Sequence, residues 1–205
     1  MRTIGIIYDT SYLMLNEKKT NVRELVYALN GIEFRRETKG WFSVKSEKTE
    51  FSDHFCIDEI IPIEVTNEIY KHFSNPDKEM AARSARKKVA ALIESGAKEV
   101  CLSGVDVSNA TNSVLGADSL TDRKQIAYAL SMVEKSWDLA IIATDDGGIL
   151  YDIVKLCKEG KPIRCYTKER EYEFYSVAPY LAKMIGWDLG GIFSLIDTGP
   201  DQLFQ

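Results

Sequence analysis

Short apolar runs alternate with longer amphipathic stretches along most of the chain. Four runs are typical of buried strands because Gly, Pro or charged residues bound each of them. They cover residues 4–8, 99–103, 138–144 and 162–166. Apolar residues at helical spacing predict helices near residues 20–30, 62–74, 77–95, 121–136 and 147–159. Parallel strands need a crossover, usually a helix, so the pattern predicts an α/β three-layer sandwich with a central parallel sheet flanked by helices.

Two stretches depart from this alternation. Residues 31–57 alternate partly between polar and apolar positions around Lys39-Gly40, which predicts a small hairpin inserted into the fold. Residues 171–205 are rich in aromatic side chains, which usually pack on the domain or on a partner. We therefore expect one domain over residues 1–170 and a C-terminal extension over 171–205 that contacts a second copy of the chain or another protein.

Composition excludes several classes of protein. The 205 residues are 45% hydrophobic and 28% charged, which is typical of an ordinary soluble domain. No apolar run approaches the ~20 residues of a membrane span. Asp9 interrupts the first apolar run where a signal peptide would continue, so we expect a cytoplasmic protein without membrane contact. The net charge of −5 repels polyanions on average, so any nucleic-acid binding requires a local basic patch.

The cysteines and histidines offer little chemistry. The four cysteines are Cys56, Cys101, Cys157 and Cys165, and they form no C-x-x-C pair. Because Cys101 and Cys165 lie in apolar strand-like runs, we expect buried free thiols there. The two histidines, His54 and His72, have no Cys or acid at tight ligand spacing, which argues against a structural zinc site.

Aspartates follow two of the predicted strands. Asp9 comes directly after the first strand, and Asp145 and Asp146 come after a later one. In an open parallel sheet, ligands bind beyond the carboxyl ends of the strands. Aspartate is also a preferred helix N-cap, so capping is the alternative interpretation for each position.

Carboxylates that share one crevice raise one another's pKa and stay ionised together when a cation lies between them. An all-oxygen site without nearby His or Cys matches hard divalent ions such as Mg²⁺ or Mn²⁺. These ions typically act on phosphoryl groups. The strand-end aspartates therefore predict a Mg²⁺ or Mn²⁺ site with phosphoryl-transfer chemistry.

Four acidic motifs follow one another along the chain. They are Ile7-Tyr8-Asp9-Thr10-Ser11, Ile60-Ile61-Pro62-Ile63-Glu64-Val65-Thr66-Asn67-Glu68, Thr121-Asp122-Arg123 and Thr144-Asp145-Asp146. Their order resembles the PIN-domain nucleases, which have an Asp after the first strand, a Glu on a helix opened by Pro, an Asp at the start of a later helix and a Thr-x-Asp strand end. The resemblance extends over roughly residues 4–166.

The resemblance implies an activity and a set of site residues. The implied catalytic residues are Asp9, Glu68, Asp122 and Asp146, and these four together with Asp145 are the implied metal ligands. The implied activity is a Mg²⁺- or Mn²⁺-dependent endonuclease that hydrolyses phosphodiester bonds in RNA, single-stranded RNA in preference, or in DNA. The preference for RNA over DNA comes from the resemblance alone.

Three positions of this site have competitors in the chain. Asp118 lies four residues before Asp122, and Asp145 is adjacent to Asp146. Glu64 lies one helical turn from Glu68 on the same face, and Glu68 itself is also explained as a solvated helix charge.

Two groups of basic residues are candidates for binding phosphates, which supply most of the affinity for nucleic acids. One group recurs at helical spacing: Arg83, Arg86, Lys87 and Lys88. The other lies in the insertion: Arg35, Arg36, Lys39, Lys45 and Lys48. Trp41 and Phe42 in the insertion are candidates for stacking on unpaired bases. For the helical group the alternative is an ordinary solvated helix face.

Two other functions compete with the nuclease. Haloacid-dehalogenase-like phosphatases also have an Asp after the first strand, but their general acid two residues later is replaced here by Ser11. A catalytically inactive PIN-like module that binds a protein through the aromatic extension is the non-enzymatic alternative. Nucleotide-binding Rossmann and P-loop folds are disfavoured because no glycine-rich phosphate motif is present.

Overall fold

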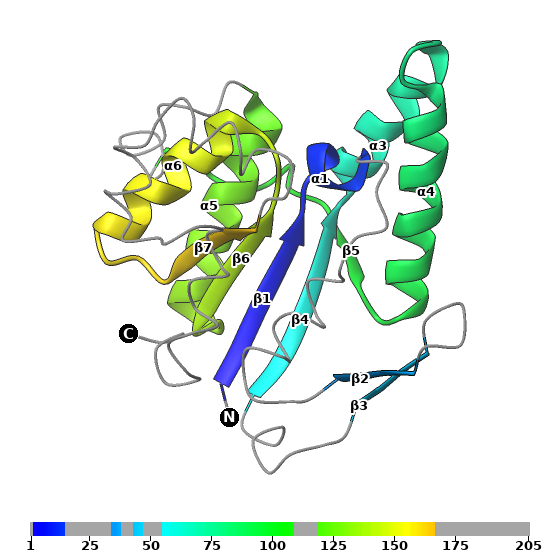
Figure 1. The fold of residues 1–205 in the computed structure, drawn as a ribbon. Helices are drawn as coiled ribbons and strands as arrows, with labels where there is room; N and C mark the ends of the chain where they lie inside the picture. Colours follow the sequence, from blue (N-terminus) through cyan, green and yellow to red (C-terminus); the bar gives the residue numbers. More distant parts are fainter. Residues whose placement is uncertain (1, 15–33, 38–42, 47–54, 109–118, 167–205) are drawn as a thin grey trace, which may run out of the picture.

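A five-stranded parallel sheet forms the centre of the molecule (Figure 1). The computed structural model describes residues 2–14, 34–37, 43–46, 55–108 and 119–166. The strand order is β5-β4-β1-β6-β7. The bounds are β1 (Arg2–Tyr8), β4 (Phe55–Pro62), β5 (Lys98–Val100), β6 (Leu139–Ala143) and β7 (Ile163–Tyr166). All four neighbouring pairs are parallel, which confirms the predicted sheet.

Helices cover both faces of this sheet, so the predicted three-layer sandwich is confirmed. The helices are α1 (Thr10–Met14), α3 (Ile63–Lys71), α4 (Glu79–Glu94), α5 (Leu120–Lys135) and α6 (Gly147–Lys158), with the 3-10 helix η2 (His72–Ser74) after α3. In Figure 1, α3 and α4 lie beside β4 and β5, and α5 and α6 lie beside β6 and β7.

Side chains of β1 alternate between two hydrophobic cores. Ile4 and Ile6 are fully buried in a core shared with α1, α3 and α4, while Ile7 is buried in a second core shared with α5 and α6. Successive residues of a strand point to opposite faces, so a strand buried on both faces is apolar throughout. This explains the unbroken apolar run that predicted β1.

Gly5 is the exception inside β1. The indole of Trp137 occupies the space that a Cβ at this position would need. A glycine is therefore required here by close packing, since any side chain would have to displace a buried ring.

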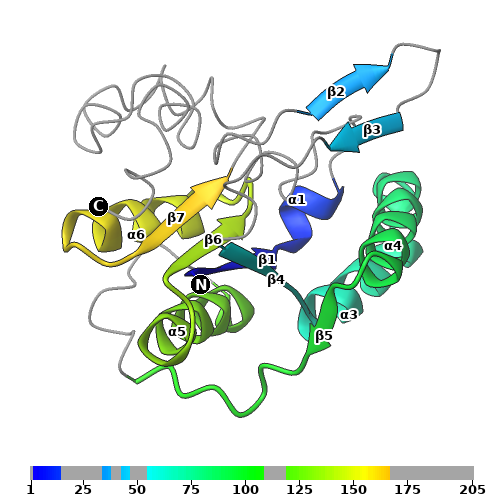
Figure 2. The same ribbon diagram turned by 90° about the horizontal axis from the view of Figure 1, so that it is seen from below.

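Two antiparallel strands lie within the predicted insertion, but its predicted end at residue 57 is wrong because β4 begins at Phe55. Strands β2 (Phe34–Glu37) and β3 (Ser43–Ser46) pair antiparallel and form a separate two-stranded sheet. Figure 2 shows this hairpin apart from the five-stranded sheet. Trp41, Phe42, the helix predicted near residues 20–30 and the extension 171–205 lie outside the described residues. The boundary predicted between domain and extension stays a prediction.

Sequence reasoning missed the short helix α1, and it also missed strand β4. Two acids, Asp58 and Glu59, interrupt its apolar run, and both have partners in the fold. Asp58 accepts hydrogen bonds from Lys98 Nζ at 2.8 Å and Trp137 Nε1 at 3.2 Å. Glu59 is buried and accepts from the Tyr8 hydroxyl at 2.6 Å. Tertiary partners therefore allow a charged dipeptide inside a central strand.

Two smaller expectations need correction. Strand β5 ends at Val100 rather than continuing to residue 103. Cys101 thus lies beyond the strand and is exposed, so the prediction of a buried thiol there is wrong, whereas it is confirmed for Cys165. Among the helices that the structure describes, none is long and apolar enough to cross a membrane.

Candidate active site

The carboxyl ends of β1 and β6 bring the two aspartate motifs together. Tyr8 and Ala143 are register partners in these adjacent parallel strands, and the Asp9 amide donates to the Ala143 carbonyl at 3.0 Å. The chain after β1 therefore runs beside the Thr144-Asp145-Asp146 segment after β6. This juxtaposition is the one predicted from the positions of the aspartates at strand ends.

Asp9 is the centre of a hydrogen-bond network. Its side chain is only 4% exposed. Its Oδ2 accepts from the Ser11 amide at 3.1 Å, the Ser11 hydroxyl at 2.5 Å and the Thr144 hydroxyl at 2.9 Å. Its Oδ1 accepts from Gln125 Nε2 at 2.9 Å. The bonds from Ser11 are local to the start of α1, and the one from its amide is a helix cap, but the bonds from Thr144 and Gln125 join Asp9 to the segment after β6 and to α5 and go beyond capping.

Asp146 both caps a helix and faces the network. Its Oδ1 accepts from the amides of Gly148 at 2.7 Å and Ile149 at 3.2 Å, so it is the N-cap of α6. Its own amide donates to the Thr144 hydroxyl at 3.0 Å. Thr144 therefore ties the Asp146 backbone to the Asp9 carboxylate. The capping interpretation is correct for Asp146 and does not exclude a second role for its other oxygen.

Asp145 has a different environment. Its side chain is buried, and its amide donates to the Ser11 hydroxyl at 2.9 Å. Both aspartates of the pair thus belong to the same region. Asp146 is the one whose charge acts on Asp122, the third carboxylate of the site.

Asp122 lies in the first turn of α5. With Ser119 it forms a capping box, in which the Asp122 amide donates to the Ser119 hydroxyl at 3.1 Å and the Asp122 carboxylate accepts from the Ser119 amide at 3.4 Å. Burial raises the pKa of Asp122 from 3.8 to about 6, and the negative charges of Asp9 and Asp146 contribute, while the Ser119 bonds oppose the rise. Three aspartates from three elements therefore share one electrostatic neighbourhood. The competitor Asp118 lies outside the described residues.

The structure separates the two glutamates of α3. Glu68 Oε2 accepts from the Thr10 hydroxyl at 2.7 Å, next to Asp9 in the chain. Glu64 instead accepts from the Leu102 amide at 2.9 and 3.1 Å and anchors the segment after β5. Glu68 is therefore the glutamate that belongs to the aspartate neighbourhood.

The chemistry of the donor set suits a hard divalent cation. Asp9, Asp122 and Asp146 offer only oxygen, which matches Mg²⁺ and Mn²⁺. A carboxylate has about four lone-pair positions, and Asp9 Oδ1 accepts one hydrogen bond from the described residues, that of Gln125. Within the described part of the chain, however, no three His, Cys, Asp or Glu side chains are grouped as ligands of one ion.

Gln125 is the site residue that sequence reasoning missed. It is fully buried in α5 and donates its amide to Asp9, three residues after Asp122 on the same helix. Its Oε1 has no hydrogen-bond partner among the residues that the structure describes. The sequence did offer one signal. Gln125 is a polar residue three positions after Asp122, a spacing that places both on the same face of the helix, and Ile126 and Ala127, which are buried, follow it.

The basic residues of α4 do not form one uniform group. Arg83 forms an exposed ion pair with Glu79 at 2.7 Å, and Lys88 Nζ donates to the Leu13 carbonyl at 3.0 Å. Arg86 and Lys87 are exposed on the same helix. Of the predicted phosphate-binding residues, Arg86 and Lys87 therefore keep a charge that no ion pair among the described residues offsets.

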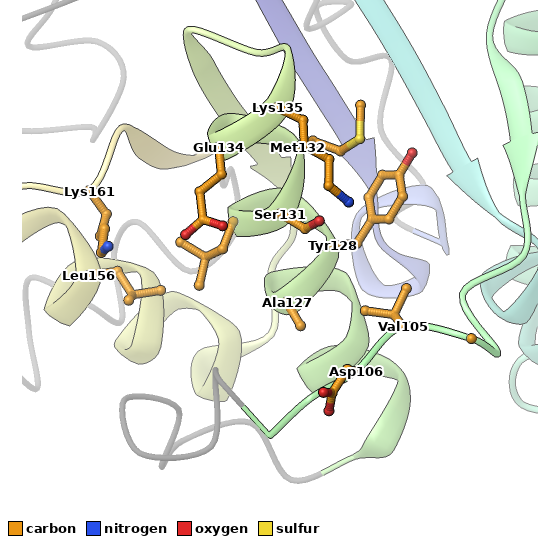
Figure 3. A pocket seen from close by; sticks show the side chains of 12 residues that line it. Val105, Asp106, Ala127, Tyr128, Ser131, Met132, Glu134, Lys135, Leu156 and Lys161 are labelled. Carbon is orange, nitrogen blue, oxygen red and sulfur yellow. The ribbon is translucent and has the colours of Figure 1, made fainter.

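A pocket of about 610 Å³ lies elsewhere, around the outer side of α5. Figure 3 shows Tyr128, Met132 and Glu134 of α5 lining it, with Asp106 below and Lys161 across from them. Asp9, Asp122, Asp145 and Asp146 do not line this pocket, which is therefore distinct from the aspartate site.

Comparison with known proteins does not identify a family for this chain. No protein-family model matches the chain, and no curated protein matches it in sequence.

Proposed function

We propose that this protein is a PIN-like endonuclease that uses Mg²⁺ or Mn²⁺ to hydrolyse phosphodiester bonds, in single-stranded RNA in preference to DNA. The observation that carries the proposal is the Asp9 network, which draws β1, β6 and α5 around one point. Helix capping alone needs no such convergence. The preference for RNA rests on the resemblance of the four acidic motifs.

In this proposal the chain positions the carboxylates that hold the ion. Asp9, Asp122 and Asp146 are the ligands, and Gln125 and Thr144 fix the Asp9 carboxylate through its two oxygens. When bound, the divalent ion polarises the phosphodiester, activates a water molecule and offsets charge on the leaving oxygen. The carboxylate of Glu68 accepts a hydrogen bond from the Thr10 hydroxyl beside Asp9. In this proposal it accepts a proton near the bound ion.

The same contacts argue against Asp9 as a phosphatase nucleophile. A nucleophilic carboxylate must present an oxygen to phosphorus. Asp9 is almost fully buried, and its Oδ2 accepts three hydrogen bonds. These donors hold Oδ2 in place and reduce its nucleophilicity, and one of them is Ser11, which stands where the phosphatases have their general acid.

The test is cleavage of a labelled single-stranded RNA and of the matching DNA, with Mn²⁺ or with EDTA. We expect internal RNA cleavage that is lost in EDTA and in Asp146→Asn. Asp138→Asn is the matched control, because Asp138 lies before the opposite end of β6 and is exposed. It accepts from the Thr3 amide at 2.6 Å, a bond that the amide oxygen of Asn retains.

Three results would overturn the proposal. Phosphate release from an aryl phosphate ester, inhibited by beryllofluoride, would support the phosphatase. Equal cleavage by Asp146→Asn and the unchanged protein would remove the aspartates from the chemistry. Absence of cleavage together with absence of Mn²⁺ binding by calorimetry would support an inactive interaction module.

A further inference from the structure

Aromatic and arginine side chains interleave where α3, η2 and α4 meet. We call this group the Tyr70 surface; it comprises Tyr70, Phe73, Arg83 and Arg86. The rings of Tyr70 and Phe73 pack edge to face at 5.4 Å between centroids. Arg83 Cζ lies 5.7 Å from the Phe73 centroid, and Arg86 Cζ lies 5.6 Å from that of Tyr70. Tyr70 remains 46% exposed, so an outside molecule can reach its ring.

The segment around this surface carries the opposite charge to the rest of the protein. Residues 70–88 contain six Lys or Arg and two Asp or Glu, while the chain as a whole has a net charge of −5. A local basic patch on an acidic protein attracts a polyanion to that patch. Charge complementarity therefore favours a nucleic acid as the occupant of the Tyr70 surface.

The two arginines differ in their availability. Arg83 bonds to Glu79 through both Nε and Nη2, at 2.9 and 2.7 Å. Arg86 has no carboxylate partner among the described residues, and Lys87 follows it in an exposed position. Arg86 is therefore the guanidinium that can exchange its aromatic contact for a phosphate.

The strengths of the competing interactions favour the exchange of the Arg86–Tyr70 contact for a phosphate contact. An exposed cation–π contact changes an equilibrium by about two- to fivefold, and 5.6 Å is close to the outer limit of about 6 Å for such a contact. Stacking of a base on an aromatic ring strengthens binding by about 5- to 150-fold. A guanidinium that leaves the ring gains a charge-assisted hydrogen bond to phosphate. An unpaired base with its phosphate can thus replace the internal contact.

We propose that Tyr70 is a stacking platform for an unpaired base of single-stranded nucleic acid and that Arg86 binds the adjoining phosphate. The proposal rests on the proposed function in one respect, namely that the same strand continues to the aspartate site. Helix α3 carries both Tyr70 and Glu68, and because side chains two residues apart project from nearly opposite sides of a helix, the strand would pass around the C-terminal end of α3 to reach the aspartate site. Figure 1 shows α3 next to α1, beyond the end of β1.

The experiment is fluorescence anisotropy of a labelled oligouridylate in EDTA, which measures binding without cleavage. Tyr70→Ala should weaken binding by about 5- to 150-fold, the equivalent of about 1–3 kcal/mol of stacking. Tyr70→Phe should bind within about twofold of the unchanged protein because it keeps the ring. Tyr70→Leu should bind as weakly as Tyr70→Ala because it keeps apolar bulk without a π face. Thermal unfolding by circular dichroism verifies that each variant is folded.

The matched arginine pair tests the phosphate contact. Arg86→Ala should reduce the slope of log K against log salt by about 0.7, the value for one phosphate of a single strand. Arg83→Ala should leave the slope nearly unchanged, because Glu79 already offsets its charge. Equal effects of the two substitutions would overturn the role of Arg86.

Other outcomes would overturn the stacking site. Unchanged binding by Tyr70→Ala would do so, as would full binding by Tyr70→Leu. Equal binding of duplex RNA or heparin, with the same loss in Tyr70→Ala, would indicate a general anion site. The proposed function fails separately: binding with the expected Tyr70 pattern but no cleavage in Mn²⁺ refutes the nuclease alone, and cleavage with unaltered Tyr70→Ala binding refutes the stacking site alone.

Discussion

Replacement of Asp122 by Asn measures how much burial and the neighbouring carboxylates destabilise the ionised form of this side chain. Asn keeps the size of the side chain and an oxygen that can accept from the Ser119 amide in the capping box. It removes the charge that burial and the neighbours Asp9 and Asp146 disfavour. The variant should therefore be more stable than the unchanged protein wherever Asp122 is ionised.

The pKa of Asp122 sets both the size and the pH range of this effect. A rise from 3.8 to about 6 corresponds to at most about 3 kcal/mol at 1.36 kcal/mol per unit. Because part of the side chain faces solvent, we reduce this to about 1–2 kcal/mol. The folded state favours the protonated form, so the stability that Asp122 contributes is complete below about pH 4 and is lost as the pH rises through about 6.

Thermal unfolding in EDTA at pH 4, 5, 6 and 7 provides the assay. Asp122→Asn should melt together with the unchanged protein at pH 4 and about 2–8 °C above it at pH 7. Mn²⁺ at pH 7 should stabilise the unchanged protein more than the variant, since a ligand that binds only the folded state raises its melting temperature. A constant difference between pH 4 and pH 7, or a variant that is less stable at pH 7, would refute the reasoning.

Three further substitutions test other parts of the fold and site. Gly5→Ala should destabilise the protein by about 1–3 kcal/mol in urea unfolding, because the new methyl group collides with a buried indole; unchanged stability would contradict this packing. Gln125→Leu should cost about 1–3 kcal/mol by removing a donor to Asp9, while Gln125→Glu should cost more at pH 7 than at pH 4. Thr10→Val should lower RNA cleavage in Mn²⁺ with little change in melting temperature, because it releases Glu68 at the edge of the site; full activity would remove Glu68 from the mechanism.

Local patterns along the chain were sufficient to predict most elements of the fold. The apolar run that became β1 and the amphipathic stretch that became α4 depend on side chains within a few residues of one another. Periodicity reports such local burial directly. The placement of Asp9 and Asp146 was predictable for the same reason, because each follows an apolar run and parallel strands end at a common edge of the sheet.

The tertiary structure was needed to place the polar residues whose hydrogen-bond partners lie far away in the chain. Glu59 is accommodated in a central strand because the Tyr8 hydroxyl, 51 positions away, donates to its Oε1, and Gln125 belongs to the site because it donates to Asp9, 116 positions away. Charged residues in an apolar run ordinarily indicate solvent, so local patterns predict the opposite.

The choice between competing carboxylates has the same physical origin. Glu64 and Glu68 are equivalent on a helix surface, with the same residue type one turn apart. Only the packing of α3 turns Glu64 toward the Leu102 amide and Glu68 toward Thr10. The sequence by itself determined most of the elements and which aspartates end at the sheet edge. The packing of those elements decided which of the acids meet, because hydrogen bonds between distant segments exist only once the sheet has assembled.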